Sequence, residues 1–427
     1  MKFVDVYKES VLLNNYILRM FILYMKKILF VILDGAGDGL RKGTSLEVAH
    51  KPILNEYTKL GFAGLLENTS GKHPDSGTSI FQLLGYPLVD YPGRGYLDAM
   101  GIGLLPKPHT LYMRANFATV KKEVKEVARG QFKPVYIVTD RRAGRDETGL
   151  KEIANDISEI NIEGFNVKFY KSLAHRGILT ISNYNVSKDI TGTDAGQVEN
   201  DLSEITAIKG DTNSHKTAAI LNKWLDQVAK LLEEHLVNKN RKIPANYILL
   251  RGPSFYNIEK TFKEKHGLVG AIIAKSPVVR GIGKHFEMDV IDVVGATGTM
   301  QTDLKAKTLA ALEALRDHDF VVLHILAPDI AGHDMVVRTK AGIIEKIDNE
   351  VFGRIKEYVD FDKTILCVTS DHITSVFSGN HEGGKFPFMI YTNGIESNNL
   401  DGYYEMVCKK GPMIDISEWM ELIMKYR

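Results

Sequence analysis

Three short apolar runs, each followed closely by an aspartate, are the feature that most restricts how this chain can fold. The pairs are residues 28–33 (ILFVIL) with Asp34, residues 320–326 (FVVLHIL) with Asp329, and residues 364–369 (TILCVT) with Asp371. Continuous apolar runs of this length are typical of parallel strands that are buried on both faces. Because ligands of open α/β sheets bind beyond the carboxyl ends of the strands, we expect the three aspartates to meet at one functional edge.

The domain organisation follows from what lies between these runs. Apolar stripes predict helices over residues 303–315 and 341–359 that pack on the sheet. The middle of the chain instead has three short strand-like runs, at residues 135–138, 177–181 and 247–250. A turn that contains arginine lies directly before or after each of them. We predict an α/β protein with a discontinuous metal-binding domain and an inserted second α/β domain that binds anions. The expected ranges are 1–24 for an extension, 25–92 and 267–427 for the first domain, and 93–266 for the insert.

Composition excludes several classes of function. The 427 residues carry a formal net charge of +1, so there is no general attraction to nucleic acid or to an anionic membrane. No run approaches the roughly 20 apolar residues that span a bilayer. Two cysteines cannot form a disulfide framework, and we expect a cytoplasmic protein. Residues 1–24 precede Met25-Lys26-Lys27, and we favour an extension from an upstream start codon over an anchor.

Histidines and aspartates at the ends of two runs have the spacing of metal ligands. Asp329 and His333 are four residues apart, so one helical turn places both on one side. Taken alone, this pair also fits a helix-capping aspartate beside an unrelated histidine. The combined set offers mixed nitrogen and oxygen ligands for two ions: Asp34, Asp329, His333, Asp371, His372 and His381. Such a set suits Mn²⁺ or Zn²⁺, and paired ions commonly promote phosphoryl transfer.

A hydroxyl group precedes the apolar segment at residues 80–84. Ser76 and Thr78 could each be an ordinary helix N-cap. Alternatively, a hydroxyl at a helix start faces free backbone amides that attract phosphate oxygens, and a nearby ion would make it a nucleophile. The local sequence does not decide between these interpretations.

The ordered set of motifs resembles the archaeal-type cofactor-independent phosphoglycerate mutases of the alkaline phosphatase superfamily. The resemblance extends from about Lys26 to the C-terminus. It rests on the stretches ILFVILDGAGDGL, SGTSIFQLLGYP, GRG, RANFATV, DRRAGR, AHRG, LLRG, GATGTMQTD, APDIAGHD and SDH. It implies an alkaline-phosphatase-like domain with a parallel sheet between helical layers, and an inserted substrate-binding domain.

The resemblance also implies roles for individual residues. One metal site would comprise Asp34, Ser76, Asp371 and His372, and the other Asp329, His333 and His381. Ser76 would be the residue that is transiently phosphorylated. The substrate's carboxylate and phosphate would be bound by arginines, whose planar fork suits oxyanions: Arg114, Arg141, Arg142, Arg145, Arg176, Arg251 and Arg280.

The implied activity is the interconversion of 3-phosphoglycerate and 2-phosphoglycerate through phosphoserine. It would need two divalent ions, Mn²⁺ first, with Mg²⁺, Co²⁺ or Zn²⁺ as alternatives, and no 2,3-bisphosphoglycerate. A small-molecule phosphoglycerate is then the expected partner, with no nucleic acid and no membrane; the sequence does not indicate an oligomeric state.

The chain departs from the family pattern close to the serine. Gly77 stands where the family usually has an acid, with Asp75 before the serine instead, and Ile80 replaces a histidine. Lys51-Pro52-Ile53 replaces a Thr-Pro-Asn stretch, and Arg280 replaces a lysine. These departures keep two alternatives open: a metal-dependent phosphomonoester or phosphonate hydrolase, and a metal-binding paralogue without turnover.

Overall fold

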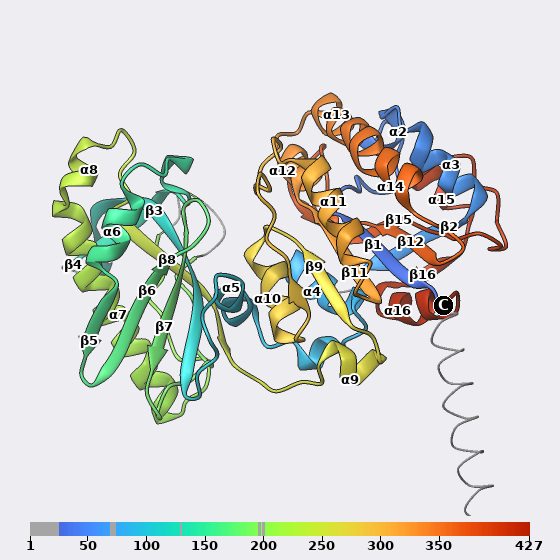
Figure 1. Cartoon of the computed structure of the whole chain (residues 1–427). Coiled ribbons are helices and arrows are strands. Elements are labelled where there is room, and N and C mark those ends of the chain that lie inside the picture. Colours follow the sequence, from blue (N-terminus) through green and yellow to red (C-terminus); the bar gives the residue numbers. More distant parts are fainter. Residues whose placement is uncertain (1–24, 69–73, 129, 195–197, 199–200) are drawn as a thin grey trace, which may run out of the picture. The chain divides into compact units, whose positions relative to one another are not determined.

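The chain forms two compact units in the computed structural model, which describes residues 25–68, 74–128, 130–194, 198 and 201–427 (Figure 1). Unit 1 comprises the described residues of Met1–Tyr91, Lys260–Val279 and Phe286–Arg427, and unit 2 comprises those of Pro92–Glu259 and Arg280–His285. The predicted extension, residues 1–24, lies outside the described residues. The assignment of metal binding to one domain and substrate binding to the other stays a prediction.

Unit 1 is built around a mixed sheet that is parallel at its centre. Its strands in spatial order are β10 (Asp289–Val290), β9 (Gly270–Ile273), β11 (Phe320–Ile325), β1 (Lys27–Leu33), β12 (Thr364–Thr369), β15 (Gly384–Tyr391), β2 (Phe62–Asn68) and β16 (Met413–Asp415). The three apolar runs of the sequence become the adjacent strands β11, β1 and β12, and all three are parallel. β15 is antiparallel to both of its neighbours, β12 and β2. The α/β prediction is confirmed for this unit.

The register of the central strands aligns their carboxyl ends. Leu33 of β1 pairs with Ile325 of β11, and Ile32 pairs with Thr369 of β12. Each strand therefore stops at nearly the same level, and the residues that follow emerge at one edge of the sheet. This alignment brings together residues that lie more than 300 positions apart in the sequence.

Helices cover both faces of the unit 1 sheet (Figure 1). One face packs Leu29 and Val31 against apolar side chains of α11 (Leu304–Ala314), α13 (Val337–Ile347) and α14 (Gly353–Tyr358). A π-helical turn, η3 (Asp348–Phe352), joins α13 to α14, so the helical run begins four residues before the predicted one. On the other face, Phe30 packs against Trp419 of α16 (Trp419–Met424), which adjoins α4 (Ser76–Leu83).

The remaining elements of unit 1 are short. They are α2 (Ser45–Val48), α3 (Pro52–Leu60), η1 (Leu88–Asp90), α9 (Phe262–His266), α12 (Ala327–His333), β13 (Ile373–Thr374), β14 (His381–Glu382), α15 (Glu405–Cys408) and η4 (Ile416–Glu418). Helix α10 (Pro277–His285) begins in unit 1 and ends in unit 2. Within the described residues, no helix is long and apolar enough to cross a membrane.

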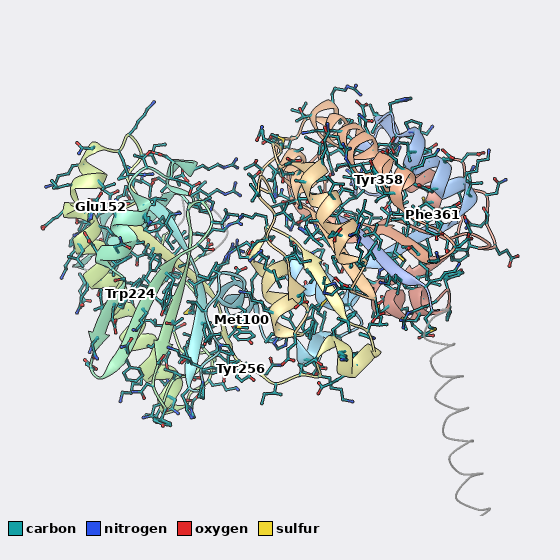
Figure 2. All side chains as sticks on the ribbon, viewed as in Figure 1. Met100, Glu152, Trp224, Tyr256, Tyr358 and Phe361 are labelled. Carbon is teal, nitrogen blue, oxygen red and sulfur yellow. The ribbon has the colours of Figure 1, made fainter. Side chains whose placement is uncertain are left out.

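Unit 2 is an α/β unit whose sheet is antiparallel throughout. The strands are β4 (Gln131–Asp140), β3 (Thr110–Ala128), β7 (Arg176–Ser182), β6 (Phe165–Lys171) and β5 (Glu159–Ile162), and β8 (Tyr247–Phe255) pairs with β3. The helical elements are α5 (Arg94–Gly101), η2 (Ala143–Arg145), α6 (Leu150–Asp156), α7 (Thr212–Glu234) and α8 (Leu236–Asn240). Trp224 of α7, labelled in Figure 2, is fully buried and stacks on Phe169 of β6. The long helix therefore completes the core of this unit.

A buried ion pair fixes the segment that follows β1. Lys340 of α13 and Asp38 are both completely buried, and the Nζ atom lies 2.9 Å from Asp38 Oδ1. The same ammonium donates to the carbonyl oxygens of Gly37 and Thr374, at 3.0 and 2.8 Å. Asp38 also accepts from the backbone amides of Ser45 and Val376. One lysine thus ties α13 to the turns after β1 and β12, which carry the predicted metal ligands.

We expect Lys340→Met to lower the free energy of unfolding by about 3 kcal/mol, because it leaves the Asp38 carboxylate buried without its cation. Denaturant unfolding of purified protein measures this change. Lys356→Met is the matched control, since Lys356 forms an exposed ion pair with Glu56, and pairs of that kind contribute about 1 kcal/mol or less. Equal effects of the two substitutions would contradict the role assigned to Lys340.

Candidate functional site

The carboxyl edge of the unit 1 sheet gathers the three aspartates predicted from the sequence. Asp34 follows β1 and Asp371 follows β12, and both are completely buried. Asp329 lies in the first turn of α12, directly after β11. The strand register accounts for this convergence, because β1 lies between β11 and β12.

One group of metal-type ligands consists of Asp329, His333 and His381. The Nε2 atoms of His333 and His381 lie 3.5 and 3.2 Å from Asp329 Oδ1. The i, i+4 spacing predicted to place Asp329 and His333 on one side of a helix is realised in α12. Their three ligand atoms lie within 4.8 Å of one another, which is close enough to hold one ion.

A second group surrounds His372 and includes the predicted nucleophile. His372 Nε2 lies 3.2 Å from Asp34 Oδ1, 3.6 Å from Asp371 Oδ2 and 3.3 Å from Ser76 Oγ. Asp34, Asp329 and His372 also form a ligand group within 4.8 Å, so the two groups adjoin. The structure therefore brings together all seven residues that were predicted to form the metal sites.

Contacts of their Nδ1 atoms fix the ring orientation of the three histidines. The Nδ1 atoms of His333 and His381 lie 2.8 and 3.1 Å from the carbonyl oxygens of Gly379 and Pro74. His372 Nδ1 lies 3.2 Å from Thr374 Oγ1, and this hydroxyl donates to Asp329 Oδ1 at 2.6 Å. An Nδ1–H that is held in this way directs Nε2 towards the cluster, which is the usual arrangement behind a metal-binding imidazole.

The electrostatics of the cluster indicate that it lacks positive charge. Burial raises the pKa of Asp371 to about 6, and the charge of Asp34 adds to the shift. Burial acts to lower the pKa of His372, but Asp371 and Asp34 outweigh it and raise the value to about 10. The two carboxylate oxygens of Asp34 lie 3.2 and 3.0 Å from imidazole nitrogens of His372 and His324, and Oδ2 of Asp371 is buried without a hydrogen bond. Buried carboxylates need a positive partner, so the ligand set fits divalent cations.

Helix α4 begins at Ser76, and the amides of the next two residues are already capped. Asp75 is the N-cap, and its Oδ1 accepts from the backbone amides of Gly77 and Thr78 at 2.7 and 3.2 Å. The expectation that these amides face the ligand is therefore wrong for this pair, because a neighbouring carboxylate already occupies them. The interpretation of Ser76 or Thr78 as the N-cap is also wrong, and Ser76 is left to face His372.

The two departures next to the serine have structural reasons. A Cβ atom on Gly77 would lie 2.4 Å from the Tyr91 hydroxyl and 3.0 Å from Val278 Cγ2. An acid at this position would therefore require Tyr91 to move. Ile80, one helical turn after Ser76, is fully buried in the apolar core. The region that follows the serine is thus packed and apolar where the family pattern is polar.

All seven predicted arginines belong to unit 2. Arg114 of β3 is paired in register with Arg251 of β8, and Arg176 begins the neighbouring strand β7. Burial lowers the pKa of Arg114 well below its usual value, and the charges of Arg94, Arg176 and Arg251 add to this effect. The Nε atoms of Arg114 and Arg176 are buried without a hydrogen bond. Crowded guanidinium groups of this kind favour an anionic ligand.

The other arginines differ in their surroundings. Asp194 binds Arg141 through two hydrogen bonds of 2.8 and 2.9 Å and lies 3.5 Å from Arg251. Arg145 is exposed and Arg142 is partly buried. Arg280 donates to the carbonyl of Gly101 at 3.4 Å. Arg141 is thus already paired with a carboxylate of the chain itself, which the sequence did not predict.

Three residues that adjoin one or other of the two clusters were not predicted from the sequence. Arg94 lies 3.7 Å from Asp98, which also lies 3.5 Å from Arg114. His175 is buried, and burial with the nearby arginines lowers its pKa to about 3, so its imidazole is neutral at neutral pH. His324, inside β11, lies 3.0 Å from Asp34. Arg94 lies in the GRG motif and His175 in the AHRG motif, so the sequence could have indicated both. His324 lies inside an apolar run, which gave no indication of a site residue.

Fold and side chains together define a class: an α/β protein with a buried cluster of cation-type ligands and a serine at the carboxyl edge of its main sheet. Among proteins of known structure, one from Pyrococcus horikoshii matches with a TM-score of 0.76 and 27% identity over 94% of this chain and 97% of that chain. The cofactor-independent phosphoglycerate mutase from Thermoplasma acidophilum matches with a TM-score of 0.63 and 28% identity over 94% of this chain and 100% of that chain.

The family follows from sequence comparison. A model of the 2,3-bisphosphoglycerate-independent phosphoglycerate mutase family matches residues 59–238. The mutase of that name from Methanopyrus kandleri is 34% identical over 398 residues, which is 90% of this chain and 92% of that protein. Its counterpart from Saccharolobus islandicus is 35% identical over 91% of this chain and 94% of that protein. The chain belongs to the 2,3-bisphosphoglycerate-independent phosphoglycerate mutase family.

We expect divalent metal uptake at pH 7.5 to release about one proton, because His372 carries a proton below its pKa of about 10 and must lose it to bind a cation. Affinity should then rise with pH between about 6 and 10, and it should fall more steeply below about 6, where Asp371 is protonated. Calorimetric titration with Mn²⁺ in buffers of different ionisation enthalpy measures the released protons. Uptake without proton release would contradict this electrostatic description.

Proposed function

We propose that this chain interconverts 3-phosphoglycerate and 2-phosphoglycerate without 2,3-bisphosphoglycerate, and that Ser76 carries the phosphoryl group between the two hydroxyls. The observation that supports this most directly is the position of Ser76 Oγ, 3.3 Å from His372 Nε2, within the buried carboxylate and imidazole cluster. Membership of the mutase family supports the choice of substrate. We place the activity in the cytoplasm, in keeping with two buried free cysteines.

In this proposal, the two ligand groups of unit 1 hold two divalent ions. The mixture of imidazole and carboxylate ligands favours Mn²⁺, with Co²⁺, Zn²⁺ or Mg²⁺ as alternatives. When bound, such ions lower the pKa of a serine hydroxyl and offset the charge on phosphoryl oxygens. These cations would offset the negative charge of the Asp34 and Asp371 carboxylates beside the serine.

The chain's own residues would carry out two displacements. In the first, the bond from Ser76 Oγ to phosphorus forms and the bond from phosphorus to the C3 oxygen of the substrate breaks; the proton lost by the serine hydroxyl is balanced by one gained at the C3 oxygen, which leaves glycerate and phosphoserine. In the second, the C2 oxygen of the same glycerate attacks phosphorus and the bond to Ser76 breaks. Arg114, Arg176 and Arg251 would hold the glycerate carboxylate, since they form the most crowded part of the arginine cluster. Retention of glycerate distinguishes a mutase from a hydrolase.

An enolase-coupled assay tests the activity. Protein treated with EDTA is supplied with 3-phosphoglycerate, with or without Mn²⁺, and without bisphosphoglycerate. We expect phosphoenolpyruvate only when Mn²⁺ is added. Release of inorganic phosphate without 2-phosphoglycerate would instead favour the hydrolase alternative, and metal binding without either product would favour the paralogue without turnover.

Ser76→Ala should reduce turnover by more than about 10³-fold, because it removes the attacking oxygen, while metal uptake stays largely intact. Thr78→Ala is the matched control, since the Thr78 hydroxyl lies on the same helical turn and donates only to the Asp75 carbonyl. Coupled kinetics and metal analysis of both variants measure the effects. Retained turnover in Ser76→Ala, or its loss in Thr78→Ala alone, would remove Ser76 from the mechanism.

A further inference from the structure

His324 is a buried imidazole that lies outside every ligand set predicted from the sequence. It is completely buried within β11, one residue before the strand ends. Its Nε2 lies 3.0 Å from Asp34 Oδ2, whereas its Nδ1 has no hydrogen-bond partner. A polar group that is buried at this depth is costly unless it is satisfied, so this side chain requires an explanation beyond packing.

The strand register directs His324 to the same face as the aspartates. His324 pairs with Ile32 of β1, which also pairs with Thr369 of β12. Side chains alternate along a strand, so residues two positions further on project to the same side. These residues are Asp34 and Asp371. The Lys307 ammonium, itself buried, donates to the His324 carbonyl and holds the end of β11 in place.

The spacing of the ligand atoms is that of one coordination shell. His324 Nε2 and Asp34 Oδ2 form a buried pair 3.0 Å apart. Two ligand atoms that each lie about 2.1 Å from one ion are separated by about 3 to 3.5 Å, so this spacing fits a shared ion as well as a direct pair. Asp371 also contributes an oxygen without a hydrogen bond, and the three ligand atoms lie within 4.8 Å of one another. The three buried side chains therefore converge closely enough to share one cation.

We propose that His324 is a direct metal ligand that shares its ion with Asp34 and Asp371. This inference rests on the proposed function, because it enlarges the ligand set of the metal site next to Ser76. The Asp34 carboxylate then lies between two imidazoles, with Oδ1 towards His372 and Oδ2 towards His324. A second nitrogen ligand favours Mn²⁺, Co²⁺ or Zn²⁺ over Mg²⁺ at this site.

Metal affinity provides a test that does not depend on turnover. Equilibrium dialysis of the EDTA-treated full-length protein against Mn²⁺ gives the number of ions bound and their dissociation constants. We expect His324→Ala to weaken one ion by at least about tenfold and to leave the ion of the Asp329 group unchanged. His324→Asp should restore binding and shift the preference towards Mg²⁺, because oxygen replaces nitrogen.

The matched control is His318→Ala. His318 precedes β11 and is also mostly buried, but its nitrogens are paired with Asp289 and the Ala314 carbonyl, away from the cluster. This variant should bind metal as the unaltered protein does. Unchanged affinity for both ions in His324→Ala would overturn the His324 assignment alone. Failure of the unaltered protein to bind any divalent ion would overturn the proposed function as well.

A measurement on the unaltered protein covers the case in which His324→Ala does not fold. In Co²⁺-substituted protein, each ligating imidazole gives a strongly shifted proton resonance from its other ring N–H, which disappears in D₂O. We expect one such resonance more than His333, His372 and His381 together provide. A spectrum with only the resonances of these three would overturn the proposal.

Discussion

The structure of unit 1 depends on the burial of several carboxylates at one edge of its sheet. Asp34 and Asp371 are fully buried, and Asp329 adjoins them across His372. Like charges in a region of low dielectric repel strongly, so this arrangement is stable only when positive charge is supplied. Imidazoles supply part of it, and the raised pKa of His372 reflects that demand. In the proposed function divalent cations meet the same demand, and their binding would stabilise the folded state.

The sequence predicted the parts of this arrangement that local patterns encode. The runs that form β1, β11 and β12 are nearly continuous and apolar, and the ends of these strands determine where the aspartates that follow them lie. His324 escaped notice because a single polar residue inside an apolar run resembles an ordinary core position. The antiparallel sheet of unit 2 was not predicted either, since short runs do not reveal which neighbour they pair with. Asp194, bound to Arg141, is a contact between distant residues that no spacing reveals.

The altered surroundings of Ser76 are internally consistent. Gly77 has no side chain because the Tyr91 hydroxyl occupies the space that a Cβ atom would need. Asp75 caps α4 from the preceding position, so a carboxylate is still present at the helix start. Ile80 extends the apolar core to within one turn of the serine. The departures therefore replace polar groups by packing, and they leave the ligand cluster and the orientation of its histidines intact.

The two units carry charge of opposite sign in their buried clusters. Unit 1 concentrates carboxylates, and unit 2 concentrates guanidinium groups whose pKa values are lowered by burial and mutual repulsion. Each cluster is costly by itself, and in the proposed function a small ligand of the opposite sign would relieve it, a divalent cation in one case and an anionic substrate in the other. Asp194 and Asp98 already neutralise part of the guanidinium charge, which limits how tightly an anion can bind. For the proposed reaction this limit would be an advantage, because a glycerate whose carboxylate is held too strongly could not turn to present its second hydroxyl.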